Sequence, residues 1–224
     1  MFEYISWILI IEAAVSSTDF LVTSMSGHLY FWNVFFASKS KVRKDILDKN
    51  DIECVVEPSN VDEDPVKESL LKEQASSEII SKNLAELKAN KVSMKKTDEI
   101  VLGADSVIDL EGELISKPEN REEAIQILRK LNGKSHLLIS SVCISKNGSM
   151  IWNYTDKAKL TMKNFTEDEL KNYLTKISDE ALYAYNVYQI EGEGRHLFSK
   201  IEGNENTIMG LPIDKIKDYL KSYE

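Results

Sequence analysis

The sequence predicts an α/β fold in which a mixed, twisted sheet is flanked by helices. The first observation is the apolar run at residues 100–110 (IVLGADSVIDL), which is typical of a buried strand. The second is the pattern at residues 121–131, which gathers apolar side chains on one side of a helix. The third is the pair of strand-type segments at 137–144 and 150–162, separated by hairpin-forming residues 146–148 (KNG). Strands and helices mix along the chain while some strands are adjacent, which favours a mixed sheet covered by helices.

The segments before residue 93 alternate strand-type runs with helical patterns. Residues 33–37 form a short apolar run typical of a strand, and Ser40 is well placed to cap the helix that follows. Residues 52–56 predict a second strand, and the acidic, turn-rich residues 58–65 predict a loop. Residues 67–92 then continue as a helical pattern.

Turn and capping residues mark the boundaries in the second half of the chain. Glu111 and Gly112 predict a turn after the buried strand, and residues 132–133 (NG) end a helix as a cap should. Residues 166–169 (TEDE) form a capping box that opens a helix to about residue 176. The last two predicted elements are a strand and a helix, at residues 197–201 and 212–223.

Composition and charge exclude several classes of protein. The 224 residues suffice for one α/β domain, with 42% hydrophobic and 29% charged residues as in ordinary globular proteins. The net charge of −9 argues against a general nucleic-acid binder, although a few clustered cations can still hold a small anionic substrate. Cys54 and Cys143 support neither a disulfide scaffold nor a zinc site. Two such thiols fit a reducing cytoplasm, so we expect a cytoplasmic protein.

Residues 1–32 are expected to be an extension outside the domain, which then spans residues 33–224. The apolar start of the chain carries Glu3 and Glu12, has no basic region, and is shorter than a membrane span. A membrane anchor or signal is the alternative, but these flanks argue against it. We therefore expect no membrane association.

Residues 38–43 (SKSKVR) join a predicted strand to a predicted helix. Free backbone N–H groups at a helix start bind anions, and serine hydroxyls with an arginine side chain complete a phosphate site. Ser38, Ser40 and Arg43 are therefore candidate phosphate ligands. Taken alone, however, this pattern is more typical of a plain helix cap beside basic surface residues.

Charged residues elsewhere could complete a site for metal and phosphate. Asp105 lies in the most apolar strand, where a carboxylate is unfavourable unless it lies at an edge, holds a metal or accepts from a turn amide. Glu63 belongs to an acidic loop, which could ligate a hard cation or simply be solvated. Lys88 and Lys117 would singly be ordinary surface lysines. Together they supply the positioning, charge neutralisation and metal site that phosphoanhydride hydrolysis needs.

The chain from residue 33 to residue 223 resembles the Maf family of nucleoside triphosphate pyrophosphatases. Eight segments carry the resemblance in order: 37–47 (ASKSKVRKDIL), 61–63 (VDE), 84–89 (LAELKA), 101–107 (VLGADSV), 112–118 (GELISKP), 122–133 (EEAIQILRKLNG), 188–192 (YQIEG) and 201–212 (IEGNENTIMGLP). The resemblance implies two lobes around a deep nucleotide cleft, a divalent cation (Mg²⁺ or Mn²⁺), a nucleoside triphosphate substrate and a homodimer.

The resemblance also assigns roles to individual residues. It implies that Glu63 and Asp105 hold the metal, with Asp105 as the proton acceptor from water. The residues it implies for substrate binding are Ser38, Ser40, Arg43, Lys88, Lys117, Ser140 and Glu191.

Glu191 stands where one branch of the family has a glutamine. A carboxylate accepts two hydrogen bonds side by side, which suits the N1–H and N2–H₂ donors of guanine, whereas glutamine suits a pyrimidine. The sequence therefore resembles the branch that acts on 7-methyl-GTP more than the branch that acts on dTTP and UTP. An ITP/XTP pyrophosphatase, and a cell-division regulator that binds nucleotide with little turnover, are the alternatives.

Residues 185–187 depart from the family pattern most clearly. Tyr185, Asn186 and Val187 stand where the family usually has alanine, glycine and a small residue. Asn186 is among the best substitutes for glycine at positive φ. The bulkier Tyr185 and Val187 predict a change in pocket shape.

Overall fold

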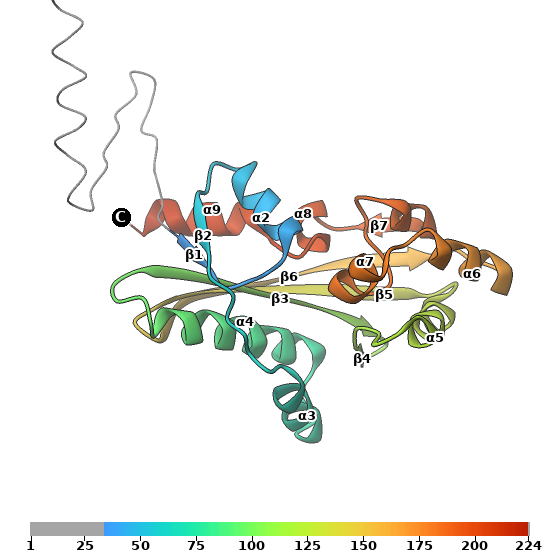
Figure 1. Ribbon diagram of the computed structural model, residues 1–224, viewed down its shortest axis with the longest axis horizontal. Helices are drawn as coiled ribbons and strands as arrows, with labels where there is room; N and C mark the ends of the chain where they lie inside the picture. The colour runs from blue at the N-terminus through green and yellow to red at the C-terminus, as the bar shows by residue number, and fades with distance from the viewer. Residues whose placement is uncertain (1–33, 224) are drawn as a thin grey trace, which may run out of the picture. The chain divides into compact units, whose positions relative to one another are not determined.

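The computed structural model describes residues 34–223, apart from the side chains of residues 183–185. The predicted extension at residues 1–32 lies outside the described residues, and so does Asn33. The described chain is built on one mixed sheet of seven strands (Figure 1). The strands are β1 (Val34–Phe36), β2 (Cys54–Val56), β3 (Ile100–Leu110), β4 (Glu113–Ile115), β5 (Ser135–Lys146), β6 (Ser149–Met162) and β7 (Phe198–Glu202).

The strand order is β2-β1-β3-β5-β6-β7, and β4 pairs with the end of β3. β1 pairs in parallel with β2 and β3, and the remaining pairs are antiparallel. The predicted hairpin is confirmed as β5 and β6, which turn at Asn147 and Gly148, both with positive φ. The predicted α/β class with a mixed sheet is therefore confirmed.

Helices cover both faces of the sheet. They are α2 (Lys41–Asp48), α3 (Asp64–Lys72), α4 (Ser77–Ser93), α5 (Arg121–Leu131), α6 (Glu167–Thr175), α7 (Asp179–Tyr185), α8 (Glu205–Ile208) and α9 (Ile213–Ser222), with a 3₁₀ helix at Glu193–Leu197. In Figure 1, α4 lies on one side of β3 and β5, and α2 and α9 lie on the other.

The side chains of β3 alternate between these two layers of helices, as they must in a strand. Leu102 and Ala104 belong to the core that α2 and α9 form with the sheet. Gly103, between them, lies against Ala85 and Ala89 of α4. A second core gathers α5, α6 and α7 around the other end of the sheet.

The prediction of one continuous helical pattern at residues 67–92 was wrong. The first helix, α3, begins earlier, at Asp64 inside the predicted loop, because Pro65 fits a first helical turn. It ends at Lys72, Gln74 has positive φ, and Ser76 caps the new helix α4 by accepting from Ile79 N–H. The short elements β4, α7 and α8 were not predicted, because they offer too few residues for a periodic pattern.

The other predicted boundaries agree with the structure within a few residues. Ser40 caps α2, and the capping box of Thr166 and Glu169 opens α6. Within residues 34–223, no helix is long and apolar enough to cross a membrane.

Candidate active site

A cleft of about 480 Å³ opens beside the middle of β3. β1 pairs with β3 only at Ile100–Leu102, and β4 pairs with it only at Ile108–Leu110. Among the described strands, residues 103–107 therefore have no partner on that edge. The cleft occupies this interval, just beyond the carboxyl end of the parallel strand β1, where ligands bind in open α/β sheets.

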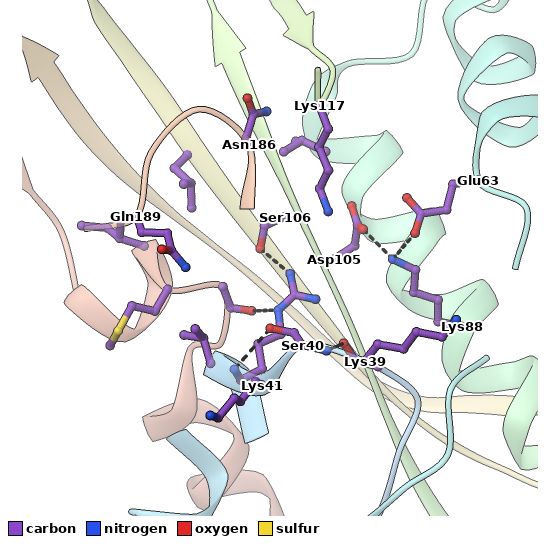
Figure 2. Close-up of a pocket in the computed structure, with 18 of the residues that line it drawn as sticks. Lys39, Ser40, Lys41, Glu63, Lys88, Asp105, Ser106, Lys117, Asn186 and Gln189 are labelled. Atoms are coloured by element: carbon purple, nitrogen blue, oxygen red, sulfur yellow. Dashed lines mark hydrogen bonds and ion pairs between the residues drawn. The ribbon is translucent and has the colours of Figure 1, made fainter. Parts of the chain in front are cut away.

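The turn between β1 and α2 forms one wall of the cleft. The Ser40 backbone N–H donates to Ser38 Oγ at 3.2 Å, and the Arg43 N–H donates to Ser40 Oγ at 3.4 Å. Lys39 and Lys41 line the cleft beside them, as Figure 2 shows. The sequence SKSKVR thus brings a helix start, two serine hydroxyls and two lysines to one place. The two lysines were not among the predicted phosphate ligands.

Arg43 is held against the cleft wall by the protein itself. Its Nε donates to the Gly210 carbonyl at 2.9 Å, one terminal nitrogen donates to the Ala104 carbonyl at 3.0 Å, and the other donates to Ser106 Oγ at 2.9 Å. Gly210 has φ of 91°, and a Cβ there would lie 2.8 Å from Arg43 Nε. Arg43 therefore ties α2 to β3 and to the turn after α8.

Glu63, Lys88 and Asp105 form the most compact charged group in the cleft. Lys88 Nζ lies 2.7 Å from Asp105 Oδ1 and 2.7 Å from Glu63 Oε1. Figure 2 shows the three side chains pointing toward one another from α4, β3 and the start of α3. The second Asp105 oxygen, Oδ2, is buried and has no hydrogen-bond partner among the described residues.

Gly103 explains how Lys88 reaches Asp105. A Cβ at Gly103 would lie 2.3 Å from the Ala85 carbonyl oxygen and 2.8 Å from the Ala89 nitrogen. Only glycine allows α4 to lie this close to β3. Asp105 faces the same layer as Gly103, two residues along the strand, so the same helix brings Lys88 to its carboxylate.

The electrostatic environment follows from this packing. Burial raises the pKa of Glu63, but the charges and hydrogen bonds of Lys88 and Lys67 outweigh it and lower the pKa to about 2. Burial and the Arg43 charge lower the pKa of Lys117, while Asp105 and Glu63 oppose that shift. The cleft thus combines an ionised carboxylate with clustered cations, inside a protein of net charge −9.

The opposite end of the cleft is formed by the segment after α7. Tyr188, Gln189 and Glu191 line it, with Glu191 exposed and Gln189 pointing inward in Figure 2. Asn186 has φ of 70° and ψ of −158°, a region otherwise almost limited to glycine, which agrees with the glycine of the family pattern. Val187 is fully buried in the core and does not line the cleft. The Tyr185 side chain lies outside the described residues.

The structure brings nearly all of the predicted site residues to this one cleft. The predicted residues that line the cleft are Ser38, Ser40, Arg43, Glu63, Lys88, Asp105, Lys117 and Glu191. Ser140 differs, because it is fully buried behind Ser106, with its Oγ 2.8 Å from Ser106 Oγ and donating to the Thr207 carbonyl at 2.7 Å. In this structure it supports Ser106 and does not face the cleft.

Besides Lys39 and Lys41, sequence reasoning missed three other residues at the site. Ser106 receives a hydrogen bond from Arg43, Lys67 lies 3.1 Å from Glu63 Oε2, and Gln189 points into the cleft. Ser106 could have been found from strand alternation, since it faces the α2 side when Asp105 faces α4. Lys67 could have been found from its spacing of four residues after Glu63 on a helix. Neither strand alternation nor helical spacing identifies Gln189 as a residue that points into the cleft.

Comparisons with known proteins identify the family of this chain. A family model described as "Maf-like protein" matches residues 33–223. A nucleoside triphosphate pyrophosphatase from Pelagibacter ubique (strain HTCC1062) is 74% identical over 188 residues, covering 84% of this chain and 96% of that protein. A protein of the same name from Caulobacter vibrioides is 38% identical over 188 residues, covering 84% and 94%.

Among solved structures, a HAM1 protein from Coxiella burnetii matches 86% of this chain and all of that chain, with a TM-score of 0.46 and 11% identity. The family assignment does not depend on it, because the family model spans all of the described residues and the relatives are similar over nearly their whole length. This chain belongs to the Maf family.

Proposed function

We propose that this protein hydrolyses a modified nucleoside triphosphate to its monophosphate and pyrophosphate, with a substrate like 7-methyl-GTP favoured. The coarser assignment, an enzyme of the nucleoside triphosphate pyrophosphatase class, follows from its family and from relatives of that name at up to 74% identity. The observation that carries it to this chain is the Glu63–Lys88–Asp105 group, which lies in the same cleft as the phosphate-binding turn.

The donor set fits a hard divalent cation that also binds substrate phosphate. The described residues hold no group of three or more His, Cys, Asp or Glu that could enclose a metal ion. Mg²⁺ is usually held by one or two carboxylates, with substrate phosphates and water completing its octahedron. Glu63 and Asp105 would hold the ion, and the buried Asp105 Oδ2 without a partner is a further oxygen donor at the same place. When bound, the ion supplies Lewis-acid polarisation of the phosphate.

The protein's own residues then have distinct tasks. The turn at residues 38–43 binds the phosphates through its N–H groups, hydroxyls and lysines. Asp105 orients the attacking water and accepts its proton. Lys88 and Lys117 stabilise the negative charge on the departing pyrophosphate. Arg43 adds positive charge from the wall and fixes the turn through its three contacts.

For the base, we propose that Glu191 accepts the N1–H and N2–H₂ donors of a guanine ring. Its place on the cleft lining, after Tyr188 and Gln189, supports this role.

We further propose a house-cleaning role for the enzyme, removing non-canonical nucleotides before they enter nucleic acid. A cytoplasmic homodimer remains a proposal from the sequence and the family resemblance.

The experiment that tests these proposals measures pyrophosphate release by the purified protein with Mg²⁺ or Mn²⁺ across canonical and modified nucleotides. Preference for 7-methyl-GTP would support the enzyme assignment and the role of Glu191. Preference for dTTP or UTP, or for ITP or XTP, would retain the enzyme and overturn the guanine assignment. Nucleotide binding without turnover of any substrate would overturn the proposed enzyme in favour of a binding regulator.

A further inference from the structure

The Lys88 ammonium occupies the place where a cation bound to both carboxylates would lie. Its nitrogen is 2.7 Å from one oxygen of Asp105 and 2.7 Å from one oxygen of Glu63. The side chains of Lys88 and Asp105 are only 11% and 8% exposed, so water screens these contacts little. A divalent cation bound to both oxygens would meet the ammonium at contact distance, and the two positive charges would repel each other.

Resting on the proposed function, we propose that Lys88 is an internal counter-ion that the metal and the nucleotide displace together. Each ligand then binds more tightly when the other is present. Lys88 would leave the two carboxylates for a phosphate oxygen of the substrate, and the metal would take its place between Glu63 and Asp105.

The cost of displacing Lys88 explains why the two events are coupled. An ammonium moved off both carboxylates inside the cleft would be a poorly solvated charge beside the positive charges of Arg43 and Lys117. A triphosphate provides the anion that it then needs. Conversely, nucleotide that draws Lys88 away removes the one lysine that bridges Glu63 and Asp105, and the metal replaces that positive charge.

Lys67, the other lysine that contacts Glu63, does not bridge Glu63 and Asp105. It contacts Glu63 Oε2 at 3.1 Å and Asp64 at 3.8 Å, and it is 22% exposed. It can therefore remain on the outer oxygen of Glu63 while a metal binds the inner one. Lys88 is the lysine that contacts both proposed metal ligands.

The coupling can be measured by binding alone, without turnover. The full-length protein is titrated with Mn²⁺, and free Mn²⁺ is followed by electron paramagnetic resonance. The titration is done with and without a saturating α,β-methylene triphosphate analogue. A parallel titration of the analogue without protein measures the Mn²⁺ that the analogue itself binds, and this amount is subtracted. We expect the analogue to lower the Kd for Mn²⁺ at least about 10-fold in the wild type, within the usual range for coupled sites.

Lys88→Met should bind Mn²⁺ at least about 10-fold more tightly than the wild type when no nucleotide is present. Its coupling should be smaller than that of the wild type, because the contact of the metal with phosphate remains and only the displacement of Lys88 is lost. Lys88→Gln provides a second test that keeps a hydrogen-bond donor. Lys82→Met, at an exposed position of the same helix, is the matched control and should keep the wild-type coupling.

Equal Mn²⁺ affinity with and without bound analogue in the wild type would overturn this inference and leave the proposed function intact. Weaker Mn²⁺ binding by Lys88→Met than by the wild type would also overturn it. If no triphosphate analogue binds, the proposed function fails and this inference fails with it.

Discussion

Gly103 of β3 lies so close to Ala85 of α4 that a methyl group on Gly103 would come within 2.3 Å of the Ala85 carbonyl oxygen. This contact sets the distance between the helix that carries Lys88 and the strand that carries Asp105. The geometry of the proposed catalytic group therefore depends on a residue that has no side chain and no proposed role in the chemistry.

Replacing Gly103 by alanine should both destabilise the protein and reduce its activity. The helix backbone must move to accommodate the methyl group, which costs about 1–3 kcal/mol for overpacking. Urea unfolding measures the first effect, and pyrophosphate release under folded conditions measures the second. Gly192→Ala is the control, because a Cβ there meets nothing within 4 Å. Equal stability of the wild type and Gly103→Ala would contradict this account of the helix position.

Asp105→Asn should lower kcat at least about 100-fold, because the amide cannot accept the proton of the attacking water and ligates a cation poorly. The substitution keeps the shape of the side chain and its position on β3. Turnover with saturating nucleotide and Mn²⁺ is the measurement, with far-UV circular dichroism to establish that the variant is folded. A variant that retains most of the wild-type turnover would remove Asp105 from the mechanism.

Glu191→Gln should reduce the preference for 7-methyl-GTP over pyrimidine triphosphates by about 10- to 100-fold. The glutamine side chain presents one donor where the guanine edge needs an acceptor, and such a bidentate pair contributes about 1–3 kcal/mol of discrimination. The ratio of kcat/KM values for the two substrates is the measurement. Glu193→Gln is the control, since Glu193 does not line the cleft and instead lies 3.7 Å from Lys176.

Gln189→Ala distinguishes the two residues at the base end of the cleft. Gln189 points into the cleft in Figure 2, so its loss should lower kcat/KM for every nucleotide if it contacts a shared part of the substrate. If the preference between bases changes with Gln189→Ala and not with Glu191→Gln, Gln189 is the residue that recognises the base, and the role given to Glu191 is wrong.

His136 should make the stability of the protein depend on pH. His136 is 2% exposed, its Nε2 lies 2.8 Å from Tyr188 Oη, and its Nδ1 has no partner among the described residues. Burial lowers its pKa to about 4. As the pH falls from the ordinary histidine value of about 6.5 toward 4, the unfolded chain takes up a proton that the folded chain does not. The free energy of unfolding should therefore decrease across this window and level off below it.

The expected decrease from His136 is on the order of 2 kcal/mol between pH 6.5 and 5. Other groups also titrate in this range, so the quantity to compare is the change in unfolding free energy between wild type and His136→Gln at each pH. That difference should shrink as the pH falls. A difference independent of pH would show that His136 binds its proton equally in both states.

The sequence by itself determined the α/β class, most long elements and most of the candidate site. β3 is a largely apolar run of eleven residues, and α5 repeats its apolar positions at helical spacing over eleven residues. Segments of this length are enough to identify a buried strand and an amphipathic helix. The charged residues of the cleft were recognisable because Asp105 is an unusual residue for so apolar a strand, and because the ordered motifs resemble one family.

Tertiary structure alone decided how these residues meet. The contact of Gly103 with Ala85, the bridge of Lys88 between Glu63 and Asp105, and the burial of Ser140 behind Ser106 each join segments that are distant in sequence. Local propensity carries no information about such distances. They are set by how closely helices pack on the sheet, and hence by the volumes of side chains on both partners.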